Sequence, residues 1–379
     1  MTPTESAPPA RRAKLTRIPA TRTLGRMNPT RSLPALLVAL CLGACSSNNS
    51  SETNTKSEAE RSYPSIGKIE RLDPALDKLV APDAKIERLA EGFNWAEGPV
   101  WVGRGGGHVL FSDVEKNTVH KWDPGTGAAT PFLTPSGYTG QTPRGGEPGS
   151  NGLTLDAQGR LVLCQHGDRR VARLNDDGKT FTTLADRYEG KRFNSPNDLC
   201  YDRSGNLYFT DPPYGLEGKN EDPKKELDFN GVYLLRKGGE VVLLTREFTY
   251  PNGVALSPDG KTLYVAQSDP KAPIVKAMDV RADGTVANSR VLFDAAHLMQ
   301  GRKGLPDGLK TDRSGNLWVT GPGGVIVLNQ DGKHLGTINT GEATANCGWG
   351  GKDGNELYVT ADMYLCRVKT KAKGTPPGR

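Results

Sequence analysis

Short runs of alternating hydrophobic and polar residues dominate the chain from about residue 85 onward, and Gly, Asp or Asn bounds each run. Alternating β-branched and aromatic residues predict strands, and Asp-x-x-Gly or Ser-Gly-Asn segments supply the positive-φ positions of tight hairpins. Long helical patterns are scarce in this region. The pattern therefore predicts an all-β fold of short strands joined by tight turns.

One phrase recurs along this region: a polar residue, a hydrophobic strand, an Asp/Gly turn and a second strand. A repeat of roughly 40 to 55 residues is typical of a propeller blade, which buries both faces only when neighbouring blades stack on it. We therefore predict a six-bladed β-propeller over residues 85–370, in which the segment from Lys85 to Leu89 adds a strand to the last blade and removes an open edge. Two β-sandwiches are the alternative, which the regular recurrence disfavours. The six copies begin at Glu97, Asn151, Asn197, Asn252, Asp307 and Asn346.

The N-terminal region differs in composition from the repeats. Arg31 precedes an apolar run from Leu33 to Leu42, which is too short to span a bilayer but has the size of a signal-peptide core. The run ends in Leu42-Gly43-Ala44-Cys45, which resembles the bacterial lipobox, whose cysteine receives the lipid. The sequence therefore predicts an exported lipoprotein that starts at Met1 or Met27.

The predicted organisation follows from this leader. We expect a lipoprotein signal peptide over residues 1–44, a lipid-anchored flexible tether over 45–84 that begins with lipidated Cys45, and a short tail over 371–379. The protein would lie on the periplasmic side of a bacterial membrane or at the cell surface, held by its lipid alone, and we expect a monomer.

Charge excludes one class of partner. The formal net charge is +6, and residues 1–44 carry seven basic groups and one acidic group, which accounts for all of it. The remaining chain is close to neutral, so nothing indicates nucleic-acid binding. Beyond the leader and the proposed lipidation site Cys45, four cysteines allow either disulfides or buried thiols, and their spacing shows no metal-type pairing. These are Cys164, Cys200, Cys347 and Cys366.

The polar residue that opens each repeat has a chemical consequence. Equivalent positions of a propeller lie at equivalent heights around its axis, so these six side chains should converge at one end of the central channel. Carboxylate and amide oxygens suit a hard cation such as Ca²⁺, and the two carboxylates, Glu97 and Asp307, balance its charge. Any single Asn-Gly or Asp-Gly is more often a turn, but the joint pattern favours a metal site.

Several motifs resemble the family of senescence marker protein and the bacterial gluconolactonases, in order and in spacing, over about residues 85–370. They are Glu97-Gly-Pro-Val-Trp101, Phe193-Asn-Ser-Pro-Asn-Asp198, Phe209-Thr-Asp-Pro-Pro-Tyr-Gly215, Pro251-Asn-Gly-Val-Ala255 and Pro306-Asp-Gly-Leu309. The resemblance implies that Glu97, Asn252 and Asp307 hold the cation, with Asn197 as a fourth ligand or a substrate contact. Animal members carry Arg two residues before the Asn that matches Asn197; here that residue is Ser195.

The chemistry that follows is hydrolysis of a sugar-acid lactone. A cation polarises the lactone carbonyl, and Asp307 orients or activates the attacking water. We expect Ca²⁺, with Zn²⁺, Mg²⁺ or Mn²⁺ as alternatives. Asn151, His166 and Asn197 are candidates to bind sugar hydroxyls, and Tyr214 is a candidate to cover the pocket.

Two other functions fit the same residues. One is a phosphotriesterase-type hydrolase on the same metal, and the other is a propeller that only binds a ligand. The sequence contains neither the Gly-x-Ser-x-Gly motif of serine hydrolases nor the His-Glu-x-x-His motif of zinc proteases. Gly103-Arg-Gly-Gly-Gly107 lacks the Lys and Ser/Thr of a phosphate-binding loop and is predicted to be a hairpin turn.

Overall fold

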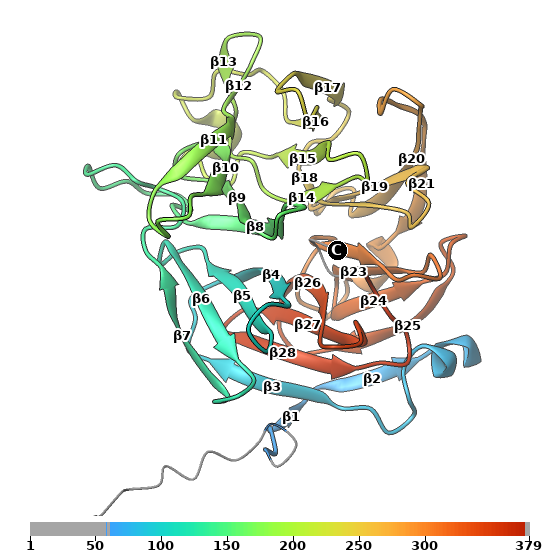
Figure 1. Ribbon diagram of the computed structural model, residues 1–379. Coiled ribbons are helices and arrows are strands. Elements are labelled where there is room, and N and C mark those ends of the chain that lie inside the picture. The colour runs from blue at the N-terminus through green and yellow to red at the C-terminus, as the bar shows by residue number, and fades with distance from the viewer. Residues whose placement is uncertain (1–57, 59–60, 376–379) are drawn as a thin grey trace, which may run out of the picture. The chain divides into compact units, whose positions relative to one another are not determined.

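The computed structural model describes residue 58 and residues 61–375, and their sheets form the predicted six-bladed β-propeller (Figure 1). The predicted leader, the lipidation site Cys45 and most of the predicted tether lie outside the described residues. No helix in the described part of the chain is long and apolar enough to cross a membrane.

Each blade has four antiparallel strands whose order in the sheet follows the chain, apart from the last. Blade one comprises β4 (Ala96–Val102), β5 (His108–Asp113), β6 (Thr118–Asp123) and β7 (Ala128–Leu133). Blade two comprises β8 (Ser150–Leu155), β9 (Leu161–Gln165), β10 (Arg170–Leu174) and β11 (Phe181–Ala185). Blade three comprises β14 (Leu199–Tyr201), β15 (Leu207–Asp211), β16 (Gly231–Leu235) and β17 (Val241–Thr245).

The second half repeats this plan. Blade four comprises β18 (Pro251–Leu256), β19 (Thr262–Gln267), β20 (Ile274–Val280) and β21 (Val286–Asp294). Blade five comprises β22 (Leu309–Thr311), β23 (Leu317–Gly321), β24 (Gly324–Leu328) and β25 (His334–Asn339). Blade six comprises β26 (Thr344–Gly350), β27 (Glu356–Ala361), β28 (Tyr364–Lys369) and β3 (Ile86–Glu91). Outside these blades are the hairpin β12 (Arg187–Tyr188) and β13 (Lys191–Arg192) and the 3₁₀ turns η2 (Pro74–Lys78), η3 (Lys219–Glu221) and η4 (Ala296–Leu298).

An N-terminal strand closes the ring, as predicted. β3 pairs antiparallel with β28, so the last blade combines both ends of the propeller. Two further strands, β1 (Ser65–Ile66) and β2 (Lys68–Arg71), extend the outer edges of blades six and five. These strands lie within residues 45–84, so ordered sheet begins earlier than the predicted boundary at residue 85. Their backbone pairing with β3 and β25 is the physical reason.

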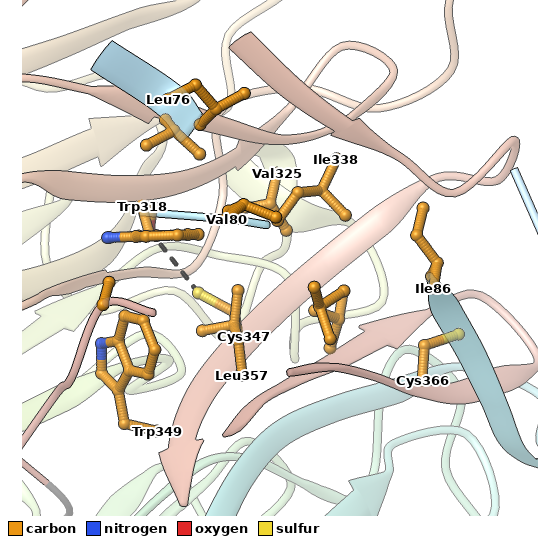
Figure 2. Close-up of a cluster of buried hydrophobic side chains, with 14 of the residues drawn as sticks. Leu76, Val80, Ile86, Trp318, Val325, Ile338, Cys347, Trp349, Leu357 and Cys366 are labelled. Atoms are coloured by element: carbon orange, nitrogen blue, oxygen red, sulfur yellow. Dashed lines mark hydrogen bonds between the residues drawn. The ribbon is translucent and has the colours of Figure 1, made fainter. Parts of the chain in front are cut away.

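The hydrophobic core of the described residues is divided into six clusters, one between each pair of neighbouring blades. Figure 2 shows the cluster between blades five and six, where Trp318 and Trp349 meet edge to face with ring centroids 5.1 Å apart. The Sγ of Cys347 donates to the carbonyl oxygen of Trp318 in the same cluster. Each core cluster combines side chains of two neighbouring blades, so each blade buries its faces against its neighbours.

Sequence left the state of the four cysteines open, and the structure shows free thiols. Cys164, Cys347 and Cys366 are buried, and Cys200 is partly buried. Burial raises the pKa of Cys200, Cys347 and Cys366 to about 12.

Candidate active site

A cavity of about 790 Å³ is lined by residues from all six blades. Most of the predicted site residues meet here although they are far apart in the sequence. They are Glu97, Asn151, Asn197, Tyr214, Asn252 and Asp307. The repeat positions therefore converge as the blade symmetry predicts.

Four side-chain oxygens at this cavity are buried and accept no hydrogen bond. Leaving a buried acceptor unpaired costs about 1–3 kcal/mol, so four such oxygens at one site imply a missing partner. Each comes from a different blade, and oxygen-only donor sets suit hard cations. The four atoms are Oδ1 of Asn151, Asn197, Asn252 and Asp307.

Blade one adds the buried carboxylate of Glu97 to this oxygen set. Glu97 is 2% exposed, and burial raises its pKa to about 8, while the negative charge of Asp198 acts in the same direction. Burial also raises the pKa of Asp307, and the neighbouring charge of Glu97 adds to the effect. Among the described residues, no group of three or more His, Cys, Asp or Glu side chains is placed to hold a metal ion. A cation at this cavity would therefore need amide oxygens as its other ligands.

Four of the six polar repeat residues are followed by a glycine, which allows close packing between blades. A Cβ on Gly152 would lie 2.6 Å from the carbonyl oxygen of Asn197, and one on Gly253 would lie 2.2 Å from that of Asp307. The strand register shifts at these glycines in β8 and β18. Such bulges re-aim side chains, so the Asn-Gly phrase marks an inner strand that points an amide at the axis.

A neighbouring hydroxyl orients the Asn252 amide. Nδ2 of Asn252 donates to Oγ of Ser268 at 2.8 Å, and this hydroxyl donates to the Pro306 carbonyl at 2.7 Å. Oδ1 of Asn252 is therefore the amide atom left for the cavity.

Asn346, at the sixth repeat position, contacts the Glu97 carboxylate. Oδ1 of Asn346 accepts the backbone N–H of Cys347 at 2.9 Å, so its amide nitrogen is free to donate. A side-chain hydrogen bond joins Asn346 to Glu97 and lowers the pKa of that carboxyl against the effect of burial. Asn346 is thus a partner of Glu97, and its oxygen is already used.

His166 lies apart from the cavity surface. It is fully buried, and its Nε2 lies 3.3 Å from Nδ2 of Asn197. His166 is not among the residues that line the cavity, whereas its neighbour Asn197 is, so the predicted substrate contact of His166 stays a prediction.

Ser195 braces the loop that carries Tyr214. Its Oγ donates to the Pro212 carbonyl at 2.6 Å and accepts the backbone N–H of Gly215 at 2.9 Å. Tyr214 in turn stacks on Tyr250, with ring centroids 5.9 Å apart, at the cavity wall. Burial and the charge of Asp307 raise the pKa of Tyr214, so its hydroxyl stays protonated.

Sequence reasoning missed Glu147, Ser268 and Tyr250, which also line the cavity. Ser268 had a signal: it follows the second strand of blade four, as His166 follows that of blade two. Glu147 lies in a Gly- and Pro-rich loop with no counterpart in the repeat, so no pattern identified it.

Known proteins share the sequence and the fold of this propeller. Residues 95–362 match the model of the SMP-30/Gluconolactonase/LRE-like region. A gluconolactonase from Zymomonas mobilis is 37% identical over 93% of this chain and 100% of its own length. The solved structure of a gluconolactonase from Xanthomonas campestris is 32% identical, with a TM-score of 0.69 over 82% of this chain and 99% of that one. Diisopropyl-fluorophosphatase from Loligo vulgaris is 26% identical over 65% of this chain and 78% of its own. The chain therefore belongs to the SMP-30/gluconolactonase/LRE-like family.

Proposed function

We propose that this protein hydrolyses sugar-acid lactones with one divalent cation held by Glu97, Asn197, Asn252 and Asp307. The observation that carries the proposal is the set of buried oxygens from separate blades that lack a partner at one cavity. Similarity to the gluconolactonases of Z. mobilis and X. campestris supports the substrate class. Because every proposed ligand is an oxygen, Ca²⁺ is the expected ion, and Zn²⁺, Mg²⁺ and Mn²⁺ are the alternatives to compare.

The side chains divide the work of the reaction. Asp307 accepts a hydrogen bond from the attacking water and aims it at the lactone carbonyl, since a carboxylate beside a cation is a weak base. Asn151 offers its unpaired Oδ1 to a substrate hydroxyl, and Tyr214 closes the wall beside it. When bound, the divalent cation supplies polarisation of the carbonyl and stabilisation of its developing negative charge. Addition of water and cleavage of the ring C–O bond give the open hydroxy acid.

A substrate comparison tests this function. We expect purified protein with Ca²⁺ to open aldonolactones, and a chelator to abolish the rate. A phosphotriester belongs in the same assay because of the similarity to diisopropyl-fluorophosphatase. Faster hydrolysis of the phosphotriester would favour the phosphotriesterase alternative, and no hydrolysis of either would favour a propeller that only binds its ligand.

We also propose that the protein is exported and anchored through lipid on Cys45. The support is the lipobox-like Leu42-Gly43-Ala44-Cys45 after an apolar run. Cells given a radiolabelled fatty acid should label the wild-type protein and fail to label Cys45→Ala. Equal labelling of both would reject the anchor.

A further inference from the structure

Glu147, a further carboxylate that lines the cavity, contacts His166, which does not line it. Its Oε2 lies 2.9 Å from Nδ1 of His166, and the Nε2 of that ring lies 3.3 Å from Nδ2 of Asn197. We propose that Glu147 and His166 are positioning residues that fix the Asn197 carboxamide with Oδ1 toward the cation. The inference rests on the proposed function, because it concerns a ligand of the proposed site.

The order of donors and acceptors sets the orientation. Nδ2 of Asn197 faces Nε2 of His166, and an amide N–H only donates, so Nε2 is the acceptor of this pair. The ring proton then lies on Nδ1, the nitrogen that faces the Glu147 carboxyl. The opposite atom, Oδ1, has no partner and is buried at the cavity.

The surroundings hold His166 in place. The side chain is fully buried, and a Cβ added to Gly215 would lie 2.8 Å from the His166 Cβ. The backbone N–H of His166 donates to the Gly149 carbonyl at 3.2 Å. Nδ1 makes no hydrogen bond in the described part of the chain, and the 2.9 Å contact with Oε2 of Glu147 is the charged contact that faces it.

The loop that carries Glu147 is itself anchored. Arg144 donates to the carbonyl oxygens of Gly167 and Gly215, on either side of the site. Glu217 accepts the backbone N–H of Gly145 at 2.6 Å. Glu147 therefore reaches His166 from a loop tied to the elements around it.

The same device orients a second proposed ligand. Ser268 accepts from Nδ2 of Asn252 and leaves its Oδ1 unpaired, as His166 does for Asn197. His166 and Ser268 each follow the second strand of their blade. His166 contacts the amide of the next blade and Ser268 the amide of its own blade, but in both pairs the amide nitrogen is taken up and Oδ1 stays without a partner.

Replacement of Glu147 separates its positioning from its charge. Calorimetric Ca²⁺ titration of metal-free protein should show that Glu147→Leu, which removes the acceptor, weakens affinity about 10- to 100-fold. Glu147→Gln keeps an acceptor oxygen and should stay within about threefold of wild type. Equal losses in both variants would make charge the cause and overturn the proposal, as would wild-type affinity in Glu147→Leu.

A matched control and a second readout complete the test. Glu240→Leu removes an exposed carboxylate that pairs with Arg236 and is not among the residues that line the cavity, so its Ca²⁺ affinity should equal that of wild type. Nitrogen NMR of the metal-free protein should show the proton of the His166 ring on Nδ1. A proton on Nε2 would overturn the positioning proposal, whether or not the protein binds Ca²⁺. Failure of the wild-type protein to bind Ca²⁺ would instead refute the proposed function.

Discussion

Glu97 and Asp307 are the two carboxylates among the proposed cation ligands, and burial raises the pKa of both. In the metal-free protein each ionised form lies in a poorly solvated site near the other. A bound cation removes this cost, so at the scale of single residues metal binding and proton release are linked.

Calcium affinity should therefore depend on pH through Glu97. Its pKa of about 8 means that below that pH a proton must leave before the cation binds. Affinity should fall by up to about tenfold per pH unit below that value. Calorimetric titrations across this range, in buffers of different ionisation enthalpy, would measure both affinity and proton release. An affinity independent of pH, with no proton released, would contradict the assignment.

The raised pKa of Glu97 should also make the stability of the metal-free protein depend on pH. Calcium affinity should rise with pH, whereas the free energy of unfolding should fall. The folded pKa of Glu97 lies above its ordinary value of 4.5, so the native state holds a proton that the unfolded chain releases. The free energy of unfolding should therefore fall as pH rises from about 4.5 to about 8. Urea denaturation of chelator-treated protein would measure it, with Glu97→Gln as the control that removes this contribution.

At the scale of secondary-structure elements, close backbone contact between blades sets the direction of the side chains on the inner strands. The bulges in β8 and β18 and the glycines beside them let each inner strand approach the next blade. Sequence predicted the strands and the converging side chains, because both follow from a repeat that can be counted. It did not predict Glu147, since the contact between its loop and His166 depends on how segments without a repeat pack.

A methyl group at Gly253 should disturb two blades. Its Cβ would lie 2.2 Å from the Asp307 carbonyl oxygen, so the inner strands must separate. We expect Gly253→Ala to lose about 1–3 kcal/mol of stability and to weaken Ca²⁺ binding. Gly238→Ala, which meets no atom within 4 Å, is the matched control. Equal stability of the two variants by urea denaturation would show that the close approach is unimportant.

Closure of the ring is a property of the whole molecule. β3 contributes buried Ile86 and Leu89 and pairs with β28, whose edge would otherwise be open. The closing strand was predicted from the need to cover that edge, but β1 and β2 were not, because the sequence before residue 85 lacks the repeat phrase.

Removal of the closing strand should be costly. A chain that begins after Gly92 loses β1 to β3 and four buried side chains, Leu76, Val80, Ile86 and Leu89, worth about 1.5–3 kcal/mol each, and exposes a strand edge. We expect it to aggregate in size-exclusion chromatography, whereas a chain that begins at Arg61, and so keeps β1 to β3, should elute as the longer protein does. A stable, non-aggregating short chain would show that closure does not need β3.

The central claim is that oxygens from separate blades hold one cation that lactone hydrolysis requires. Its most direct test is to add Ca²⁺ stepwise to chelator-treated protein and to measure bound metal and the rate of lactone opening in the same samples. The account predicts that the rate rises in proportion to bound Ca²⁺ and stops rising at one ion per chain. Full activity before any Ca²⁺ is added would contradict it.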